Sequence, residues 1–252
     1  MLGRNVIRYL QTSVPGVWER KASLYNFVMQ TTGLMVDAEF KLLRRFGTLG
    51  TVLDIGGNYG QSIISIRRNA QPAKILTFEP IRVLSDRLEA RYAGDPAVEI
   101  RNFALSDAPG ELTLYIPKYK YAVLDGLASL EKDEVTSWLA TPDLFWNFKP
   151  KHLTIMENTV PVMTLDSFGL APDVVKIDVQ GMELAVVRGG IETFRQHRPL
   201  AIVEAPCDEL VATFEELGMR AYGFDGHSLL DEWRGRTNAV FLSDALKMRL
   251  NL

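Results

Sequence analysis

The sequence lacks the features that several large classes of protein require. Its 252 residues include one cysteine, Cys207, so no intramolecular disulfide can form, and we expect a reducing compartment such as the cytoplasm. No apolar run approaches the roughly 20 residues that a membrane-spanning helix needs. The 28 basic and 31 acidic residues give a formal charge of −3. This balance argues against a nucleic-acid partner, because nucleic-acid-binding proteins present a basic surface.

Three familiar ligand motifs are also missing. The glycines after the first predicted strand are Gly56, Gly57 and Gly60, and their spacing does not match the G-x-G-x-x-G pattern of nicotinamide-binding folds. The phosphate-binding pattern G-x-x-x-x-G-K-[ST] does not occur. No His/Cys cluster has the spacing of a zinc site, and we predict no bound metal. A nicotinamide-dependent oxidoreductase is therefore disfavoured, but it stays open as an alternative enzyme class.

Short β-branched runs alternate with helical patterns after residue 47. This β-α-β order predicts parallel strands joined by right-handed crossovers. The last two runs are joined by a link too short for a helical crossover, so we expect them to pair antiparallel. The pattern predicts an α/β, doubly wound sheet of seven main strands with an antiparallel last strand. The expected strands lie at 51–57, 74–80, 98–104, 173–179, 199–206, 220–225 and 237–243.

Two further segments flank or interrupt this alternation. Residues 1–47 are predicted to be an N-terminal helical extension of a domain that covers 48–252. The extension has a basic helix that could pack on the body, on a second subunit, or weakly on an anionic membrane surface. Residues 118–157, between the third and fourth parallel strands, lack a clean period, as is typical of a lid. The alternative is a cap whose aromatic residues fill a core: Trp138, Phe145, Trp146 and Phe148.

The strongest local motif is DIGGNYG, which directly follows a strand and precedes a helix. It contains Asp54, Gly56, Gly57, Asn58 and Gly60. Glycines let the backbone turn sharply and approach a ligand closely. The amino end of a helix offers free N–H groups to an anion. A ligand with one ammonium and one carboxylate suits this motif, with the acid holding the ammonium and the N–H groups holding the carboxylate.

Polar residues also end the next two predicted strands. Glu79 ends the second strand, where an acid can accept both hydroxyls of a ribose. Asn102 and Ala104 end the third, where they could meet an adenine. Open α/β sheets bind ligands at the carboxyl ends of their strands. The order and spacing of these features therefore indicate an amino-acid-bearing nucleoside such as S-adenosylmethionine.

The runs DIGGNYGQS, TFEP, NFALSD, VPVMTLDSF, VVKIDVQGMELAVVRGG and RPLAIVEAP resemble the FkbM family of S-adenosylmethionine-dependent methyltransferases over residues 50–242. The most diagnostic part is K-I-D-x-x-G-x-E, from Lys176 to Glu183. Gln180 departs from the family, which usually has an acid there. The resemblance implies a class I methyltransferase (Rossmann-like) fold and methyl transfer. The acceptor it implies is most often a hydroxyl of a sugar, a glycan or a natural product.

Two acids are candidates for the chemistry. A hydroxyl must lose its proton as it is methylated, and a carboxylate with a pKa near 3.9 is a weak base unless burial raises that value. In this fold Asp178 ends the strand beside that of Asp54, so it is the first candidate for base or acceptor anchor. Glu204, at the end of the fifth strand, is the second. Alternatively, Asp178 contacts only the cofactor or caps the next helix, or the two acids hold one Mg²⁺.

A non-catalytic interaction module that keeps the cofactor fold is the remaining alternative. The complete set of Asp54, Gly56, Gly60 and Glu79 disfavours it, because nothing structural requires all four. The sequence leaves open which small molecule or glycan accepts the methyl group. It equally leaves open whether the chain forms a homo-oligomer.

Overall fold

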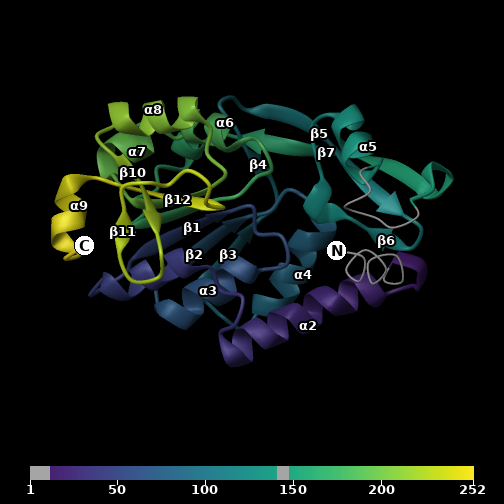
Figure 1. The fold of residues 1–252 in the computed structure, drawn as a ribbon, viewed down its shortest axis with the longest axis horizontal. Helices are drawn as coiled ribbons and strands as arrows, with labels where there is room; N and C mark the ends of the chain where they lie inside the picture. The colour runs from purple at the N-terminus through teal and green to yellow at the C-terminus, as the bar shows by residue number, and fades with distance from the viewer. Residues whose placement is uncertain (1–11, 141–147) are drawn as a thin grey trace. The chain divides into compact units, whose positions relative to one another are not determined.

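The computed structural model describes residues 12–140 and 148–252 (Figure 1). Phe145 and Trp146 of the expected insert lie outside the described residues. Contacts within the chain define two compact units, one of residues 1–28 and 111–160 and the other of 29–110 and 161–252. Of the helices in the described ranges, none combines the length and apolar character that crossing a membrane would take.

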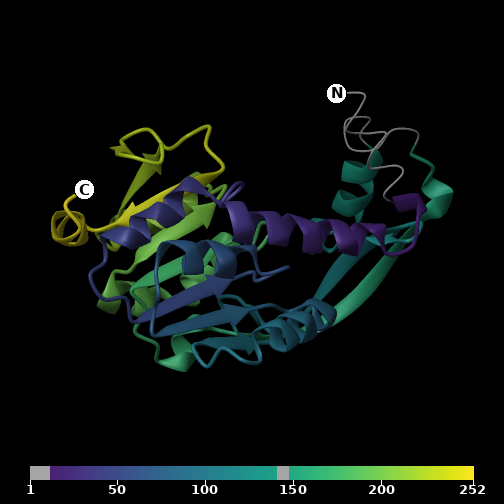
Figure 2. The ribbon, with the colours of Figure 1, turned by 90° about the horizontal axis from the view of Figure 1, so that it is seen from below.

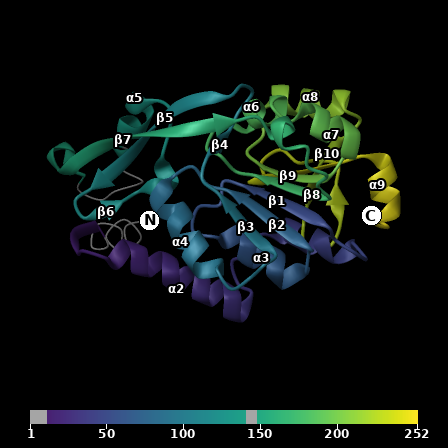
Figure 3. The same ribbon diagram turned by 180° about the vertical axis from the view of Figure 1, so that it is seen from behind.

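A sheet of order β11-β10-β12-β9-β8-β1-β2-β3 forms the centre of the larger unit (Figure 3). The five strands from β9 to β3 pair parallel, and β12 runs antiparallel to both β9 and β10. The expected antiparallel pairing of the last two long strands is confirmed. The short strand β11 lies outside β10 and makes eight strands where seven were predicted. The strands are β1 Thr51–Ile55, β2 Lys74–Phe78, β3 Val98–Arg101, β8 Val174–Ile177, β9 Leu200–Glu204, β10 Arg220–Phe224, β11 Leu229–Leu230 and β12 Asn238–Leu242.

Helices cover both faces of this sheet, because the side chains of each strand alternate between two apolar clusters. Helices α6, α7 and α8 bury their apolar side chains on one face, and η1, α3, α4 and α9 do so on the other. Figure 2 shows η1 and α3 in front of the sheet. The bounds are η1 Ala38–Arg45, α3 Gln61–Asn69, α4 Arg82–Tyr92, η4 Leu165–Phe168, α6 Glu183–Arg188, α7 Ile191–His197, α8 Asp208–Glu216 and α9 Asp244–Arg249.

The face covered by η1 also carries the polar residues at the strand ends. Val52 packs in the apolar cluster on this face, and two-residue alternation puts Asp54 on the same side. The same relation connects Val174 with Lys176, and Ile202 with Glu204. A row of ionisable side chains therefore begins where the apolar core of this face stops.

The predicted third strand is shorter than expected. It ends at Arg101, and Ala104 begins a separate two-residue strand, β4 (Ala104–Leu105), which pairs parallel with Val162 and Met163. The long strand β7 that contains this partner covers Leu153–Met163. Ala104 is thus hydrogen-bonded into a second sheet, of order β4-β7-β5-β6.

The smaller unit has an apolar core of its own. Tyr119 is fully buried and stacks on Phe148 with 5.2 Å between ring centroids, and Val135 and Leu139 pack in the same cluster. Phe148 is partly buried and packs against this core, which for this residue agrees with the alternative interpretation of the insert as a cap. The remaining elements are α2 Val17–Thr32, β5 Gly110–Tyr119, β6 Ala122–Val123, η2 Asp125–Leu127, α5 Lys132–Ala140 and η3 Pro150–His152.

Candidate active site

The glycine turn after β1 is shaped first by contacts within the chain. Gly56 has φ +93°, and a Cβ atom there would overlap the carbonyl oxygen of Asp178. A Cβ atom at Gly57 would likewise overlap the methyl group of Thr77. The N–H groups of both glycines donate to the carbonyl of Phe78, at 3.0 and 3.1 Å. These two glycines let the loop after β1 lie directly against β2 and the residues after β8.

The second half of the turn leads into α3. Gly60 has φ +84° and immediately precedes the helix, a backbone conformation that glycine adopts without steric cost. Asn58 also has a positive φ, of 45°. Its side-chain Oδ1 is buried and has no hydrogen-bond partner among the described residues. The turn thus presents an amide oxygen and the amino end of a nine-residue helix at one place.

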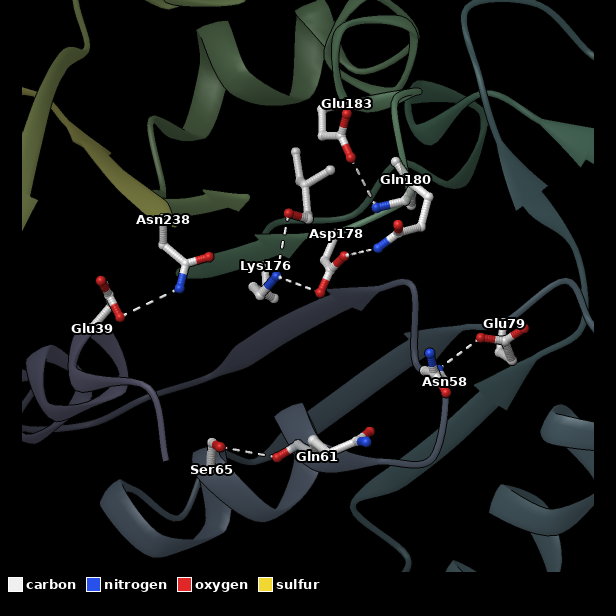
Figure 4. Close-up of polar contacts among 12 residues, drawn as sticks. Glu39, Asn58, Gln61, Ser65, Glu79, Lys176, Asp178, Gln180, Glu183 and Asn238 are labelled. Atoms are coloured by element: carbon white, nitrogen blue, oxygen red, sulfur yellow. Dashed lines mark hydrogen bonds and ion pairs between the residues drawn. The ribbon is translucent and has the colours of Figure 1, made fainter. Parts of the chain in front are cut away.

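Glu79 and Asn102 fasten the neighbouring loops to this turn. The Glu79 carboxylate accepts the N–H of Asn58 at 2.7 Å and that of Ile81 at 2.8 Å, and the residue is 4% exposed (Figure 4). The Asn102 side-chain amide donates to the carbonyls of Glu79 and Pro80, at 2.9 and 3.0 Å. Both residues therefore stabilise the loops at the carboxyl ends of β1 and β2.

Asp54 is a fully buried acid that one ligand group would satisfy. The Thr77 hydroxyl donates to its Oδ2 at 3.2 Å, while Oδ1 has no partner within the described part of the chain. Burial raises the pKa of Asp54 to about 7, against the opposing effects of Lys176 and of the Ser62 and Thr77 hydroxyls. A buried, unpartnered carboxylate oxygen beside a glycine turn fits the ammonium of an amino-acid ligand, since burying a charge unpaired is costly. The residues present therefore fit the methionine part of S-adenosylmethionine.

Lys176, in β8, and Asp178, directly after β8, form an ion pair of which only the lysine is buried. The Lys176 Nζ lies 3.3 Å from Asp178 Oδ2, and it also donates to the carbonyl of Ile177 at 3.3 Å. The Lys176 side chain is 3% exposed, whereas that of Asp178 is 34% exposed. A ligand in solution can therefore reach Asp178 but not the lysine that holds it. Figure 4 shows the ion pair between the two side chains.

The loop after Asp178 is fixed by Gln180 and Glu183. The Gln180 side chain donates to Asp178 Oδ1 at 3.2 Å, whereas an ionised acid at this position would repel Asp178. Glu183, the first residue of α6, accepts the N–H groups of Val179 and Gly181 at 3.1 and 3.2 Å. Glu183 thus stabilises the loop and the amino end of the helix.

Asp178, directly after β8, and Glu204, the last residue of β9, are the two sequence-predicted catalytic candidates; their strands are paired, and each acid affects the pKa of the other. The neighbouring Asp178, together with burial, raises the pKa of Glu204 to about 8. Burial alone would raise the pKa of Asp178, but the effects of Glu204, Lys176 and Gln180 outweigh burial and lower that pKa. Two adjacent carboxyl groups cannot both ionise cheaply, so at neutral pH the pair holds one proton, on Glu204.

Two acids of the N-terminal segment, Asp37 and Glu39, lie on the same side of the sheet as Lys176 and Asp178. The sequence did not indicate this proximity. Burial and the charge of Asp178 raise the pKa of Asp37, with Lys176 opposing. Glu39 is buried, and the Asn238 side chain approaches its Oε2 at 3.5 Å (Figure 4). Only the position of η1 over the sheet reveals this proximity. In the described ranges, no three His, Cys, Asp or Glu side chains are arranged to hold a metal ion.

The sheet order, with β12 antiparallel between β9 and β10, is that of the class I, Rossmann-like methyltransferase fold. The family profile described as the methyltransferase FkbM domain matches residues 54–225. The chain therefore belongs to the FkbM family of S-adenosylmethionine-dependent methyltransferases.

Individual proteins match the chain either over a short segment or at low sequence identity. The AMB antimetabolite synthetase AmbE of Pseudomonas aeruginosa is 38% identical over 98 residues, which cover 35% of this chain and 4% of the synthetase. An FkbM methyltransferase of Methylobacillus flagellatus superposes with a TM-score of 0.46 and 13% identity, over 77% of this chain and 43% of that one. The O-methyltransferase TomG of Streptomyces achromogenes, solved with S-adenosylmethionine, gives a TM-score of 0.41 and 14% identity over 96% of both chains.

Proposed function

We propose that the chain methylates a hydroxyl group of a small molecule or glycan, in the cytoplasm. When bound, S-adenosylmethionine supplies an electrophilic methyl group. The observation that carries the proposal is the accessible Asp178 carboxylate, paired with Glu204 at the same strand edge as the glycine turn. An O-methylation releases one proton, and this pair is a group that can take it up.

The cofactor-binding residues are proposed from the geometry of the turn. Asp54 would pair with the ammonium, and the backbone N–H groups at the start of α3 would hold the carboxylate. Glu79 would accept the ribose hydroxyls in addition to the loop N–H groups, since a carboxylate has about four acceptor positions. The remaining proposed contacts are Gly56, Gly57, Asn58 and Gly60 along the turn and Asn102 and Ala104 at the adenine.

Asp178 is proposed to receive the hydrogen bond of the acceptor hydroxyl. Lys176 keeps it ionised and fixed in place, which orients the oxygen before transfer. Methyl transfer would replace the sulfur–methyl bond of S-adenosylmethionine with a C–O bond and leave S-adenosylhomocysteine. The hydroxyl proton would pass to the carboxyl pair. The pair would then hold two protons, one from the acceptor hydroxyl and the one already on Glu204, and Glu204 would hold or release the second of these. Loss of one proton to solvent would reset the site.

The experiment is incubation with methyl-labelled S-adenosylmethionine and a pool of hydroxyl and amine acceptors, followed by mass spectrometry. We expect label on oxygen. Asp178→Asn should slow turnover about 10²-fold or more while S-adenosylhomocysteine binding changes little. The matched control is Asp208→Asn, which should retain full activity. Asp208 is an exposed acid at the start of α8 and is paired with Arg234. Label found only on nitrogen or carbon acceptors would refute O-methylation.

We also propose that the insert of residues 118–157 contributes to the choice of acceptor. Flat aromatic faces stack well on sugar rings and apolar ring systems. Trp146→Ala should raise the acceptor KM and leave cofactor affinity unchanged. Phe148→Ala is the contrasting variant, because Phe148 is packed on Tyr119 and its loss should lower stability instead. If both variants only lower stability, the insert has no part in selecting the acceptor.

A further inference from the structure

A pocket of about 460 Å³ lies in the larger unit, away from the proposed methyl-transfer site. It opens between the last residues of α7 and one side of α9, along the whole length of that helix. Strand β9 begins at Leu200, just beyond α7, and ends at Glu204, so four residue steps separate the pocket from the catalytic edge by about 13 Å. Its main lining residues are Arg195, His197, Arg198, Ser243, Leu246 and Arg249.

The pocket carries positive charge that the protein does not balance. Arg195 is paired with Glu192. Within the described ranges, neither Arg198 nor Arg249 forms an ion pair with an acid, and no Asp or Glu lines the pocket. The Arg249 guanidinium lies over the Phe46 ring, 5.8 Å from its centroid, a contact that orients it without neutralising it. Several guanidinium groups at one cavity repel each other unless an anion lies between them.

The backbone at Arg198 is a second, independent observation. Arg198 has φ 43° and ψ 54°, the left-handed conformation at the end of α7. Glycine or asparagine usually occupies such a position. Pro199 follows, and a proline strongly favours extended backbone in the residue before it. Strained non-glycine residues of this kind concentrate at ligand sites, where a particular side chain is needed.

We infer that this pocket binds a small phosphorylated molecule, at a site separate from methyl transfer. The planar guanidinium fork matches the geometry of phosphate oxygens, and several forks together suit more than one phosphate group. The Ser243 hydroxyl accepts the Leu246 N–H at 3.3 Å and still has its own proton to donate. The volume lies within the range of about 300–1,000 Å³ typical of small-molecule sites, and the polar lining disfavours an apolar ligand.

The first test is calorimetry and thermal denaturation of the full chain with pyrophosphate, at ionic strength matched with chloride. Inorganic phosphate and a nucleoside diphosphate are the other two probes, which separate a single phosphate, a bare diphosphate and a diphosphate on a larger molecule. We expect pyrophosphate to bind more tightly than chloride or phosphate. Arg198→Gln and Arg249→Gln should each weaken binding about tenfold or more, as expected for loss of a charge-assisted hydrogen bond. Arg188→Gln, a surface arginine paired with Glu209, should bind like the parent.

A second variant keeps the test informative if Arg198→Gln folds poorly. Arg198→Gly removes the guanidinium and relieves the left-handed backbone. Without ligand its Tm should equal or exceed that of the parent, while its response to pyrophosphate should be lost. S-adenosylhomocysteine binding should be unchanged in every variant, which separates this site from the proposed methyl-transfer site. Equal pyrophosphate binding by the parent, Arg198→Gly and Arg249→Gln, or no binding by the parent, would overturn the inference.

Discussion

Asp178 and Glu204 are neighbouring carboxyl groups at the ends of the paired parallel strands β8 and β9, and the Lys176 Nζ lies 3.3 Å from Asp178 Oδ2. Their proximity gives the two acids different protonation states. Asp178 stays ionised because Lys176, Gln180 and Glu204 all lower its pKa, and Glu204 carries the proton. The charge state of the site is therefore a property of the pair.

The pair predicts how turnover depends on pH. Asp178 is already ionised at neutral pH, but protonated Glu204 lowers its pKa. Loss of the Glu204 proton, whose pKa is raised to about 8, therefore leaves Asp178 the stronger base. We expect kcat to increase as pH rises through about 8 and then to level off. In Glu204→Gln this limb of the pH–rate profile should disappear, because the amide does not titrate. A parent profile that is flat between pH 6.5 and 9 would contradict a role for this proton.

Cofactor affinity should also depend on pH. Only ionised Asp54 can pair with an ammonium, and its pKa is raised to about 7. Calorimetry with S-adenosylhomocysteine should show tighter binding as pH rises through about 7. Asp54→Asn should bind about tenfold more weakly or worse at pH 8, and its affinity should change little with pH. Glu79→Ala should weaken binding as well, but the dependence on pH should remain.

The same raised pKa values predict how stability depends on pH. Asp54 and Glu204 bind protons more tightly in the folded chain than in the unfolded one. In the range between the unfolded and folded pKa values the native state holds more protons, so the free energy of unfolding falls as pH rises. Urea denaturation should thus give a lower midpoint at pH 8 than at pH 5. Asp54→Asn should reduce the difference between the urea midpoints at pH 5 and pH 8. A parent midpoint that rises from pH 5 to pH 8 would contradict the pKa assignments.

Gly56 offers a test of the close contact with Asp178. A methyl group there meets the Asp178 carbonyl oxygen, in addition to the strain of a positive φ. Gly169→Ala is the matched control, because Gly169 has φ +56° but open space around its Cβ position. We expect Gly169→Ala to cost about 1–2 kcal/mol, as left-handed backbone does. Gly56→Ala should cost more than this, and equal losses in denaturation experiments would argue against the close approach.

The sequence predicted those parts of the molecule that depend on local pattern. Runs such as DVVKIDV are strongly apolar and bounded by turn residues, so strands, their parallel pairing and the glycine turn could be inferred. Strand β11 could not, because Leu229 and Leu230 lie in a polar stretch and only pairing with β10 makes them a strand. The prediction of one continuous third strand was wrong beyond Arg101 for a similar reason, because Ala104 pairs with Val162, which is distant in the sequence.

The candidate site shows the same limit. Asp178 and Glu204 could be placed at adjacent strand ends from topology alone. Their shared proton depends on side-chain positions that no spacing encodes. Asp37 was missed because the sequence GLMVDAEF has no motif around it, and only the path of η1 over the sheet brings it near Lys176. Long-range packing thus supplies what local sequence cannot.

The tight approach of Gly56 to the Asp178 backbone has a consequence for redesign. Because the turn after β1 and the loop after β8 touch through main-chain atoms, neither can be rebuilt or lengthened without displacing the other. Libraries aimed at new acceptors would do better to vary side chains around Asp178 while keeping its backbone intact. Paired substitutions at the two loops should show strong epistasis, whichever acceptor is selected.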